Sequence, residues 1–237
     1  PKFTLSPEEM ALFAQMIDSR ARGRPVAYLM GEKEFWGLML AVTPDVLIPR
    51  PETEALLETA VNLWTAEESL NFADVGTGSG AIGLAMAHLY PYSQGLVTDL
   101  SPLALQVAKC NISAHCKQSQ LSCVCCDLLT ACAPNSLDAV LSNPPYISSA
   151  AYWAMDREVR NFEPVQALWA GIQGIEIHVR LIRQAAKVLR RGGWLCMEMG
   201  CDQTDALRSF LKKDEGRWWA EPMVVRDWSG LDRILAM

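Results

Sequence analysis

The spacing of hydrophobic residues changes repeatedly along the chain, and these changes predict strands and helices in alternation. Apolar runs typical of buried strands lie at 72–75, 95–98, 121–125, 137–141 and 194–198, with a closing strand pair at 224–226 and 233–235. Helical spacing predicts helices at 53–64, 79–89, 102–114, 175–189 and 204–212. Such alternation predicts an α/β fold, in which a mostly parallel seven-stranded sheet carries helices on both faces.

The first part of the chain shows a different pattern. Ser6, Pro7 and the two glutamates that follow form a helix start, with a capping residue, a proline in the first turn and acids that complement the helix dipole. Helical spacing then predicts a helix over 6–22, and a strand pair around Gly37 is expected at 34–42. We therefore expect 1–31 to be an N-terminal helical segment with its linker, and 32–237 to be the main domain.

Composition and charge narrow the class of protein. Half of the 237 residues are hydrophobic, enough for one sizeable core. The net charge is −6 and the 21 lysines and arginines are scattered, which disfavours nucleic acid as a partner because such binding relies on cations that neutralise phosphates. No apolar stretch approaches the ~20 residues that cross a bilayer, and no signal peptide is visible. We expect no membrane partner and a cytoplasmic location, or an organellar matrix if a transit peptide preceded Pro1.

Eight cysteines raise the question of a metal or a disulfide. Cys123 and Cys126 make a C-x-x-C pair, but a strand at 121–125 would point them to opposite faces of the sheet. A zinc site also needs further ligands, and neither Cys196 with Cys201 nor the histidines offer a suitable spacing. We therefore expect no metal, and cysteines that are reduced, small and buried.

A glycine-rich loop follows the first predicted strand of the sheet, at 74–80. Its glycines allow a tight turn and close approach to a ligand, and the helix that follows presents free N–H groups. Asp99 ends the next strand, where a carboxylate can accept both hydroxyls of a ribose. The pattern predicts a nucleoside site. Because Gly78, Gly80 and Gly83 also match the dinucleotide fingerprint, a nicotinamide-dependent oxidoreductase is the first alternative, and a turn without a ligand is the second.

The sequence Asn143-Pro144-Pro145-Tyr146 decides between these alternatives. It follows the strand at 137–141, and it resembles the signature of methyltransferases that modify amide or exocyclic amino nitrogens. The Asn143 side-chain oxygen and the Pro144 carbonyl can each accept one N–H, which orients a planar nitrogen and stabilises the positive charge that forms on it. The prolines fix that carbonyl, and Tyr146 can pack on the planar group.

This chemistry needs no strong general base before the transfer. The histidines are therefore expected to be ordinary helix residues, and they are His88, His115 and His178.

With these motifs in view, the chain resembles the release factor glutamine methyltransferase family over nearly its whole length. The Arg-Pro-Glu-Thr-Glu sequence at 50–54 is more specific than the glycine loop, which many folds share. The segments that carry the resemblance lie at 25–31, 34–38, 48–54, 74–80, 143–146, 163–168, 192–193 and 198–200.

The resemblance implies a Rossmann-like class I methyltransferase fold that uses S-adenosyl-L-methionine. Asp99 would bind the ribose of this donor, Asp127 and Leu128 would lie by its adenine, and Asn143 would lie between donor and substrate. The residues implied at the methionine part are Gly76, Thr77, Gly78, Ser79 and Gly80. The residues implied at the substrate are Asn143, Pro144, Pro145 and Tyr146, with Asn143, Pro144 and Tyr146 as the catalytic ones. The implied reaction methylates the glutamine amide in the Gly-Gly-Gln motif of peptide chain release factors.

Three departures from the family pattern bear on these expectations. The helix at 6–22 corresponds to the last helix of the family's N-terminal helical domain, which affects docking of the substrate. Relatives follow Ala167-Leu168 with two glycines and an acid, whereas this chain has Trp169-Ala170-Gly171. Leu128 stands where some relatives have an aromatic residue, which predicts weaker binding of the donor.

Two further alternatives stay open. A nucleic-acid amino-methyltransferase acting on adenine or guanine shares the Asn-Pro-Pro-aromatic signature, but the acidic balance argues against it. A binding module that has lost activity is disfavoured by the intact Asp99 and Asn143.

Overall fold

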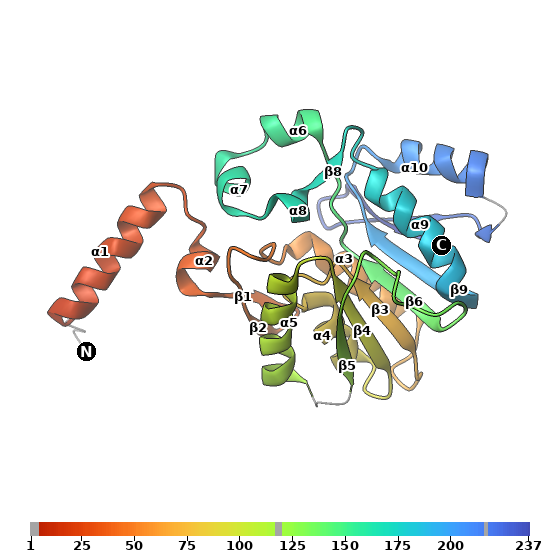
Figure 1. Cartoon of the computed structure of the whole chain (residues 1–237), viewed down its shortest axis with the longest axis horizontal. Coiled ribbons are helices and arrows are strands. Elements are labelled where there is room, and N and C mark those ends of the chain that lie inside the picture. Colours follow the sequence, from red (N-terminus) through yellow and green to blue (C-terminus); the bar gives the residue numbers. More distant parts are fainter. Residues whose placement is uncertain (1–4, 117–119, 216–217) are drawn as a thin grey trace.

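A parallel sheet with an antiparallel edge forms the centre of the molecule (Figure 1). The computed structural model describes residues 5–116, 120–215 and 218–237. Within them the sheet has seven strands in the order β10-β11-β9-β6-β3-β4-β5, and β11 and β10 pair antiparallel. The strands in chain order are β3 (Asn71–Val75), β4 (Gln94–Asp99), β5 (Leu121–Cys125), β6 (Leu137–Ser142), β9 (Leu189–Glu198), β10 (Met223–Arg226) and β11 (Asp232–Ala236). The predicted fold class and all seven strands are confirmed.

Helices cover both faces of this sheet, because successive residues of each strand point to opposite sides. Phe72 belongs to the core under α3, α4 and α5, whereas the next residue, Ala73, packs in the core under α9 and α10. The helices are α3 (Glu54–Leu63), α4 (Ala81–Leu89), α5 (Pro102–His115), α9 (Glu176–Val188) and α10 (Thr204–Phe210). His88, His115 and His178 lie in these helices, as expected.

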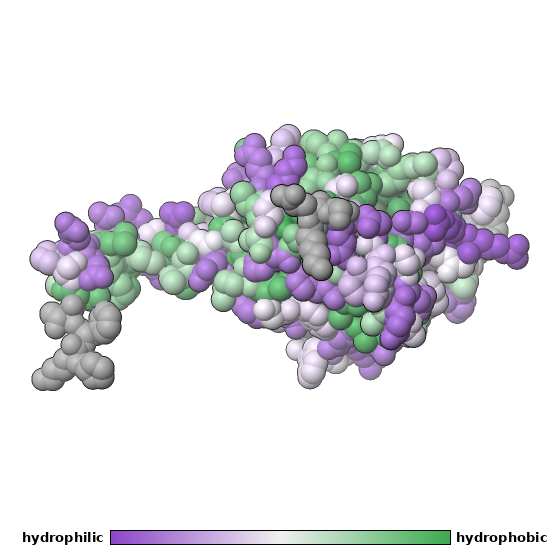
Figure 2. Space-filling view, turned by 90° about the horizontal axis from the view of Figure 1, so that it is seen from below, coloured by the Kyte–Doolittle hydropathy of each residue, from purple (hydrophilic) through white to green (hydrophobic). Residues whose placement is uncertain are grey.

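The N-terminal helix stands away from the body of the molecule (Figures 1 and 2). Helix α1 (Pro7–Ala21) begins at Ser6 with the expected cap, since the Ser6 hydroxyl accepts from the Glu9 backbone N–H and the Glu9 carboxylate accepts from the Ser6 backbone N–H. None of its fifteen described residues is buried. Helix α2 (Val26–Met30) and the hairpin of β1 (Glu32–Phe35) and β2 (Leu38–Ala41) connect α1 to the main body. The division at residue 31 stays a prediction.

A segment between β6 and α9 forms a separate layer at the carboxyl ends of the strands. Its two short strands, β7 (Ile147–Ser148) and β8 (Trp169–Gly171), pair in parallel. Three short helices connect them, α6 (Ser149–Ala154), α7 (Arg157–Phe162) and α8 (Val165–Leu168). These elements were not predicted from the sequence, because helices of four to six residues are too short to show a clear period.

Two expectations from the sequence were wrong in detail. The cysteines are free thiols, but of the eight only Cys196 is buried, while Cys110, Cys125 and Cys201 are exposed. Cys116, Cys123 and Cys132 are partly buried and pack against the edge of the core, while Cys110 and Cys125 are on the surface. In addition, β9 begins at Leu189, five residues before the strand predicted at 194–198. The shift in register where β9 meets β6 takes up the extra residues.

Candidate active site

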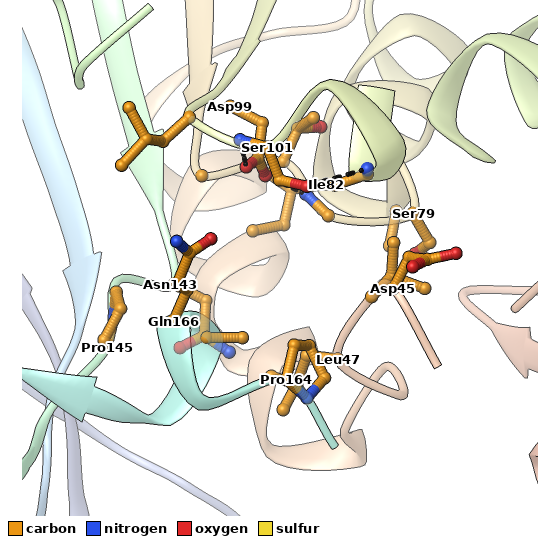
Figure 3. Close-up of a pocket in the computed structure, with 18 of the residues that line it drawn as sticks. Asp45, Leu47, Ser79, Ile82, Asp99, Ser101, Asn143, Pro145, Pro164 and Gln166 are labelled. Atoms are coloured by element: carbon orange, nitrogen blue, oxygen red, sulfur yellow. Dashed lines mark hydrogen bonds between the residues drawn. The ribbon is translucent and has the colours of Figure 1, made fainter. Parts of the chain in front are cut away.

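A cavity of about 380 Å³ opens at the carboxyl ends of β3, β4 and β6 (Figure 3). Ligands in open parallel sheets bind at this edge, because the loops that follow adjacent strands converge there. Nine of the residues expected from the sequence line this cavity together. They are Gly76, Thr77, Gly78, Ser79, Asp99, Asp127, Leu128, Asn143 and Pro145.

The remaining three expected residues lie beside the cavity and do not line it. Gly80 caps α4 with a φ of 86°, a backbone conformation that glycine adopts without strain. Pro144 is buried, and the Tyr146 hydroxyl donates to Glu198 Oε1 at 3.3 Å. Burial raises the pKa of Tyr146, and nearby Glu198 raises it further, so its hydroxyl stays protonated. The packing of Tyr146 on a substrate stays a prediction.

The glycine loop is held in place by the neighbouring strand. The backbone N–H groups of Gly76 and Thr77 both donate to the Thr98 carbonyl at 2.9 Å. Gly78, which has a φ of 54°, donates its N–H to Asp99 Oδ2 at 2.9 Å. The loop is therefore fixed to β4 before any ligand binds.

Asp99 joins two loops that line the cavity. Its Oδ1 accepts from the Ser101 N–H at 2.8 Å, while Oδ2 accepts from the Gly78 N–H. Each carboxylate oxygen can accept a second hydrogen bond, so both remain able to bind hydroxyl groups. Burial raises the pKa of Asp99, although these N–H groups act in the opposite direction by favouring the charged form.

Asp127 and Leu128 line the cavity next to the end of β4. Asp127 is paired with Arg180 of α9, whose guanidinium also lines the cavity. Leu128 has a φ of 53°, which is uncommon for a residue with a side chain, and its carbonyl accepts from the Thr98 hydroxyl at 3.1 Å. Backbone in this conformation is found often at ligand sites, where the surrounding structure holds it in place.

Asn143 is held by two residues whose roles were not predicted from the sequence, Thr53 and Glu198. Its Nδ2 donates to Thr53 Oγ1 at 2.9 Å, and the Thr53 hydroxyl donates to Glu198 Oε2 at 2.6 Å. Thr53 lies just before α3, whereas Glu198 ends β9 and is 1% exposed. With Nδ2 turned to Thr53, the side-chain oxygen of Asn143 faces the cavity (Figure 3).

A second unassigned pair closes the cavity on the side of the β7–β8 segment. Glu163, which is buried, accepts from the Ile48 N–H at 3.2 Å and is paired with Arg50. These contacts bring the loop at 44–53 against Pro164 and Gln166, all of which line the cavity. Among the described residues that line it, both arginines, Arg50 and Arg180, are thus held by carboxylates.

Asp74, behind the glycine loop, is buried and does not line the cavity. Its Oδ2 accepts from the Thr77 hydroxyl at 2.5 Å and from the Gly83 N–H at 2.8 Å, so it fixes the loop to the start of α4. Burial raises its pKa to about 6, which outweighs these two hydrogen bonds.

We expect Asp74→Asn to change how stability depends on pH. Between the unfolded pKa of about 3.9 and the folded value of about 6, the unfolded chain gives up a proton that the folded chain keeps. Rising pH over this range therefore lowers the free energy of unfolding of the wild type, by about 3 kcal/mol through this group. Relative to the wild type, Asp74→Asn should gain stability from pH 4.5 to 7 in urea titrations. A difference that stays constant with pH would contradict this expectation.

Other structural findings bear on cofactors and location. Among the residues that the structure describes, no three His, Cys, Asp or Glu side chains gather as a metal site would require. Within the same ranges, no helix is both long and apolar enough to cross a membrane.

Comparison with known sequences identifies relatives along almost the whole chain. The family model described as "Methyltransferase small domain" matches 51–159. The release factor glutamine methyltransferase of Nitratidesulfovibrio vulgaris is 41% identical over 99% of this chain and 79% of its own length. Those of Moorella thermoacetica and Koribacter versatilis are 40% and 36% identical, over 97% and 99% of this chain and 80% and 82% of their own lengths.

Solved structures share the fold at lower sequence identity. A methyltransferase from Pyrococcus furiosus superposes with a TM-score of 0.61 at 16% identity, covering 94% of each chain. The catalytic domain of hMettl16, in complex with the MAT2A 3'UTR hairpin 6, superposes with a TM-score of 0.66 at 15% identity, covering 94% of this chain and 91% of its own. At these identities the likeness concerns the fold alone.

Proposed function

Because this chain belongs to the release factor glutamine methyltransferase family, and so is an S-adenosylmethionine-dependent methyltransferase, we propose that its cavity brings the donor and a release-factor glutamine together at Asn143. The observation that carries this proposal is the position of Asn143, which shares one cavity with Asp99 and turns its side-chain oxygen inward. We propose further that the glutamine is the one in the Gly-Gly-Gln motif and that the partner is a peptide chain release factor of the cytoplasm.

The chemistry of the cavity fits S-adenosylmethionine. Asp99 can accept the two ribose hydroxyls while it holds Gly78, and the loop at 76–79 would lie along the methionine part. Leu128 would face the adenine with Asp127 beside it. Since Arg50 and Arg180 are neutralised by carboxylates, the cavity suits a sulfonium better than the pyrophosphate of a nicotinamide dinucleotide.

The residues at the end of β6 would prepare the glutamine for methyl transfer. The amide nitrogen would take the methyl group of the donor, the bond from that methyl to the donor sulfur would break, and the nitrogen would release one N–H proton to solvent. That nitrogen is a poor nucleophile, because its lone pair is delocalised into the carbonyl. Asn143 Oδ1 and the Pro144 carbonyl each accept one N–H of the substrate, which holds the nitrogen in place and stabilises the positive charge that develops on it. No histidine takes part in this step, and His178, whose pKa burial lowers to about 4, is neutral in the core.

We expect the chain to methylate a release factor and not nucleic acid. With labelled donor, a release-factor panel should accept the label before and after nuclease treatment, because the net charge of −6 does not favour binding to phosphates. Oligonucleotides serve as the comparison at several salt concentrations. Stronger labelling of an oligonucleotide, falling steeply as salt rises, would establish the nucleic-acid alternative instead.

A further inference from the structure

We propose that Thr53 and Glu198 are positioning residues that set which way round the Asn143 amide faces. This inference rests on the proposed function. It concerns the three side chains that join the ends of β6 and β9 to the start of α3, in the order Asn143, Thr53, Glu198.

An asparagine amide can be placed in two ways that differ by a half-turn, with nearly the same shape but opposite chemistry. With Oδ1 toward the cavity it accepts a substrate N–H, whereas with Nδ2 toward the cavity it repels one. Nothing in the asparagine itself selects the productive orientation, so a neighbour that distinguishes donor from acceptor must do so.

The contacts of Thr53 make that selection. Its hydroxyl carries one proton, which goes to the carboxylate of Glu198 at 2.6 Å. An ionised carboxylate only accepts hydrogen bonds, so Thr53 Oγ1 is left to accept and Asn143 must present Nδ2, at 2.9 Å. If the Asn143 amide were turned by a half-turn, its Oδ1 would face Thr53 Oγ1, whose one proton is already donated to Glu198. Two acceptors would then lie against each other.

Glu198 is itself fixed from several sides. The Tyr146 hydroxyl donates to its Oε1, and His178 Nε2 contacts its backbone carbonyl at 2.9 Å. Burial raises the pKa of Glu198, while the Thr53 hydroxyl, Arg233 of β11 and the Tyr146 hydroxyl act in the opposite direction by favouring the charged form. Because Glu198 is 1% exposed and Thr53 is 5% exposed, water cannot readily replace either partner. The direction of the chain of hydrogen bonds is therefore set inside the protein, before a substrate arrives.

Thr53→Val tests this inference, because valine keeps the shape of threonine and removes the hydroxyl. We expect the single-turnover rate at saturating donor to fall roughly tenfold or more, since Asn143 loses the partner that orients it. Thr53→Ser should remain within about threefold of the wild type, since it restores the hydroxyl. Thr59→Val is the matched control: Thr59 is also buried, but its hydroxyl donates to the Ala55 carbonyl of its own helix, at 2.8 Å. It should leave the rate unchanged.

Two further measurements distinguish loss of Asn143 positioning from a general loss of folded structure. In the Asn143→Ala background, Thr53→Val should cause almost no additional loss, because the group that it positions is gone. In the wild type, the side-chain N–H signals of Asn143 should exchange slowly with water in NMR spectra. They should exchange faster in Thr53→Val but not in Thr59→Val.

The outcomes that overturn the inference are distinct from failure of the proposed function. A wild-type protein that methylates no release factor would overturn the proposed function, while the NMR comparison would still test the positioning. Thr53→Val with a normal rate, losses that multiply with Asn143→Ala, or unchanged exchange at Asn143 would each overturn the role of Thr53. Glu198→Gln, which replaces the fixed acceptor by a group able to present either atom, should slow the reaction. An unchanged rate would remove Glu198 from the proposal.

Discussion

Asn143→Ala is expected to lower the rate of methyl transfer by roughly 10²–10³, with a much smaller effect on binding of the donor. The expectation follows from the geometry of the amide, whose Nδ2 is held by Thr53 while Oδ1 faces the cavity. Alanine removes an acceptor that is positioned where positive charge forms on the substrate nitrogen. Single-turnover rates with saturating donor and a release factor measure this step without interference from product release.

Asn143→Asp distinguishes the acceptor role of this side chain from its positioning. A carboxylate keeps an acceptor in the cavity, but it cannot donate to Thr53 Oγ1, whose single proton already goes to Glu198. It also adds a negative charge near the sulfonium. We expect a rate between those of the wild type and Asn143→Ala, with substantial activity left. Near-normal rates in both variants would mean that the substrate amide is held elsewhere.

Asp99→Ala is expected to weaken binding of S-adenosylmethionine by about 1.5–3 kcal/mol, or roughly 10- to 150-fold. The loss has two sources: the acceptors for the ribose hydroxyls, and the hydrogen bonds that hold Gly78 and Ser101. Calorimetric titration with the donor and with its demethylated product measures this loss. Turnover should recover at high donor concentration, because Asp99 does not touch the substrate amide in this proposal.

Asp138→Ala provides a control for removing a carboxylate. Asp138 also accepts a backbone N–H, from Asn71 at 2.8 Å, but it lies near the beginning of β6, at the opposite end of the sheet from the cavity. Its loss should leave the affinity for the donor unchanged. Tight binding of NADH with no response to S-adenosylmethionine would contradict the assignment of the cavity altogether.

The sequence was sufficient to predict features that depend on residues close together along the chain. The glycine loop and Asn143 directly follow a strand and Asp99 ends one, so a correct assignment of the strands places all three at one edge of the sheet. The cap at Ser6 could be predicted equally well, because it is formed by residues three positions apart.

The sequence was not sufficient for contacts between distant segments. Thr53 and Glu198 are 145 positions apart, and Arg50 and Glu163 are 113 positions apart, so no local period relates them. All four fall in segments that carry the family resemblance, which marked them as candidates without showing what they touch. The cysteines were misjudged for a similar reason: a small apolar residue predicts burial only on average, and its depth depends on which face of α5 or β5 it occupies.

In this fold, the alignment of the reactants and the shape of the cavity rim depend on different parts of the structure. The parallel strands β3, β4 and β6 provide the first. The glycine loop, Asp99 and Asn143 stand on the ends of neighbouring strands, whose spacing of about 4.8 Å is fixed by backbone hydrogen bonds. The alignment of the two reactants is therefore a property of the framework. The β7–β8 segment, inserted after β6 with its own strand pair, adds Pro164 and Gln166 to the rim. We therefore expect that exchange of that insert would alter the choice of acceptor more than the geometry of transfer.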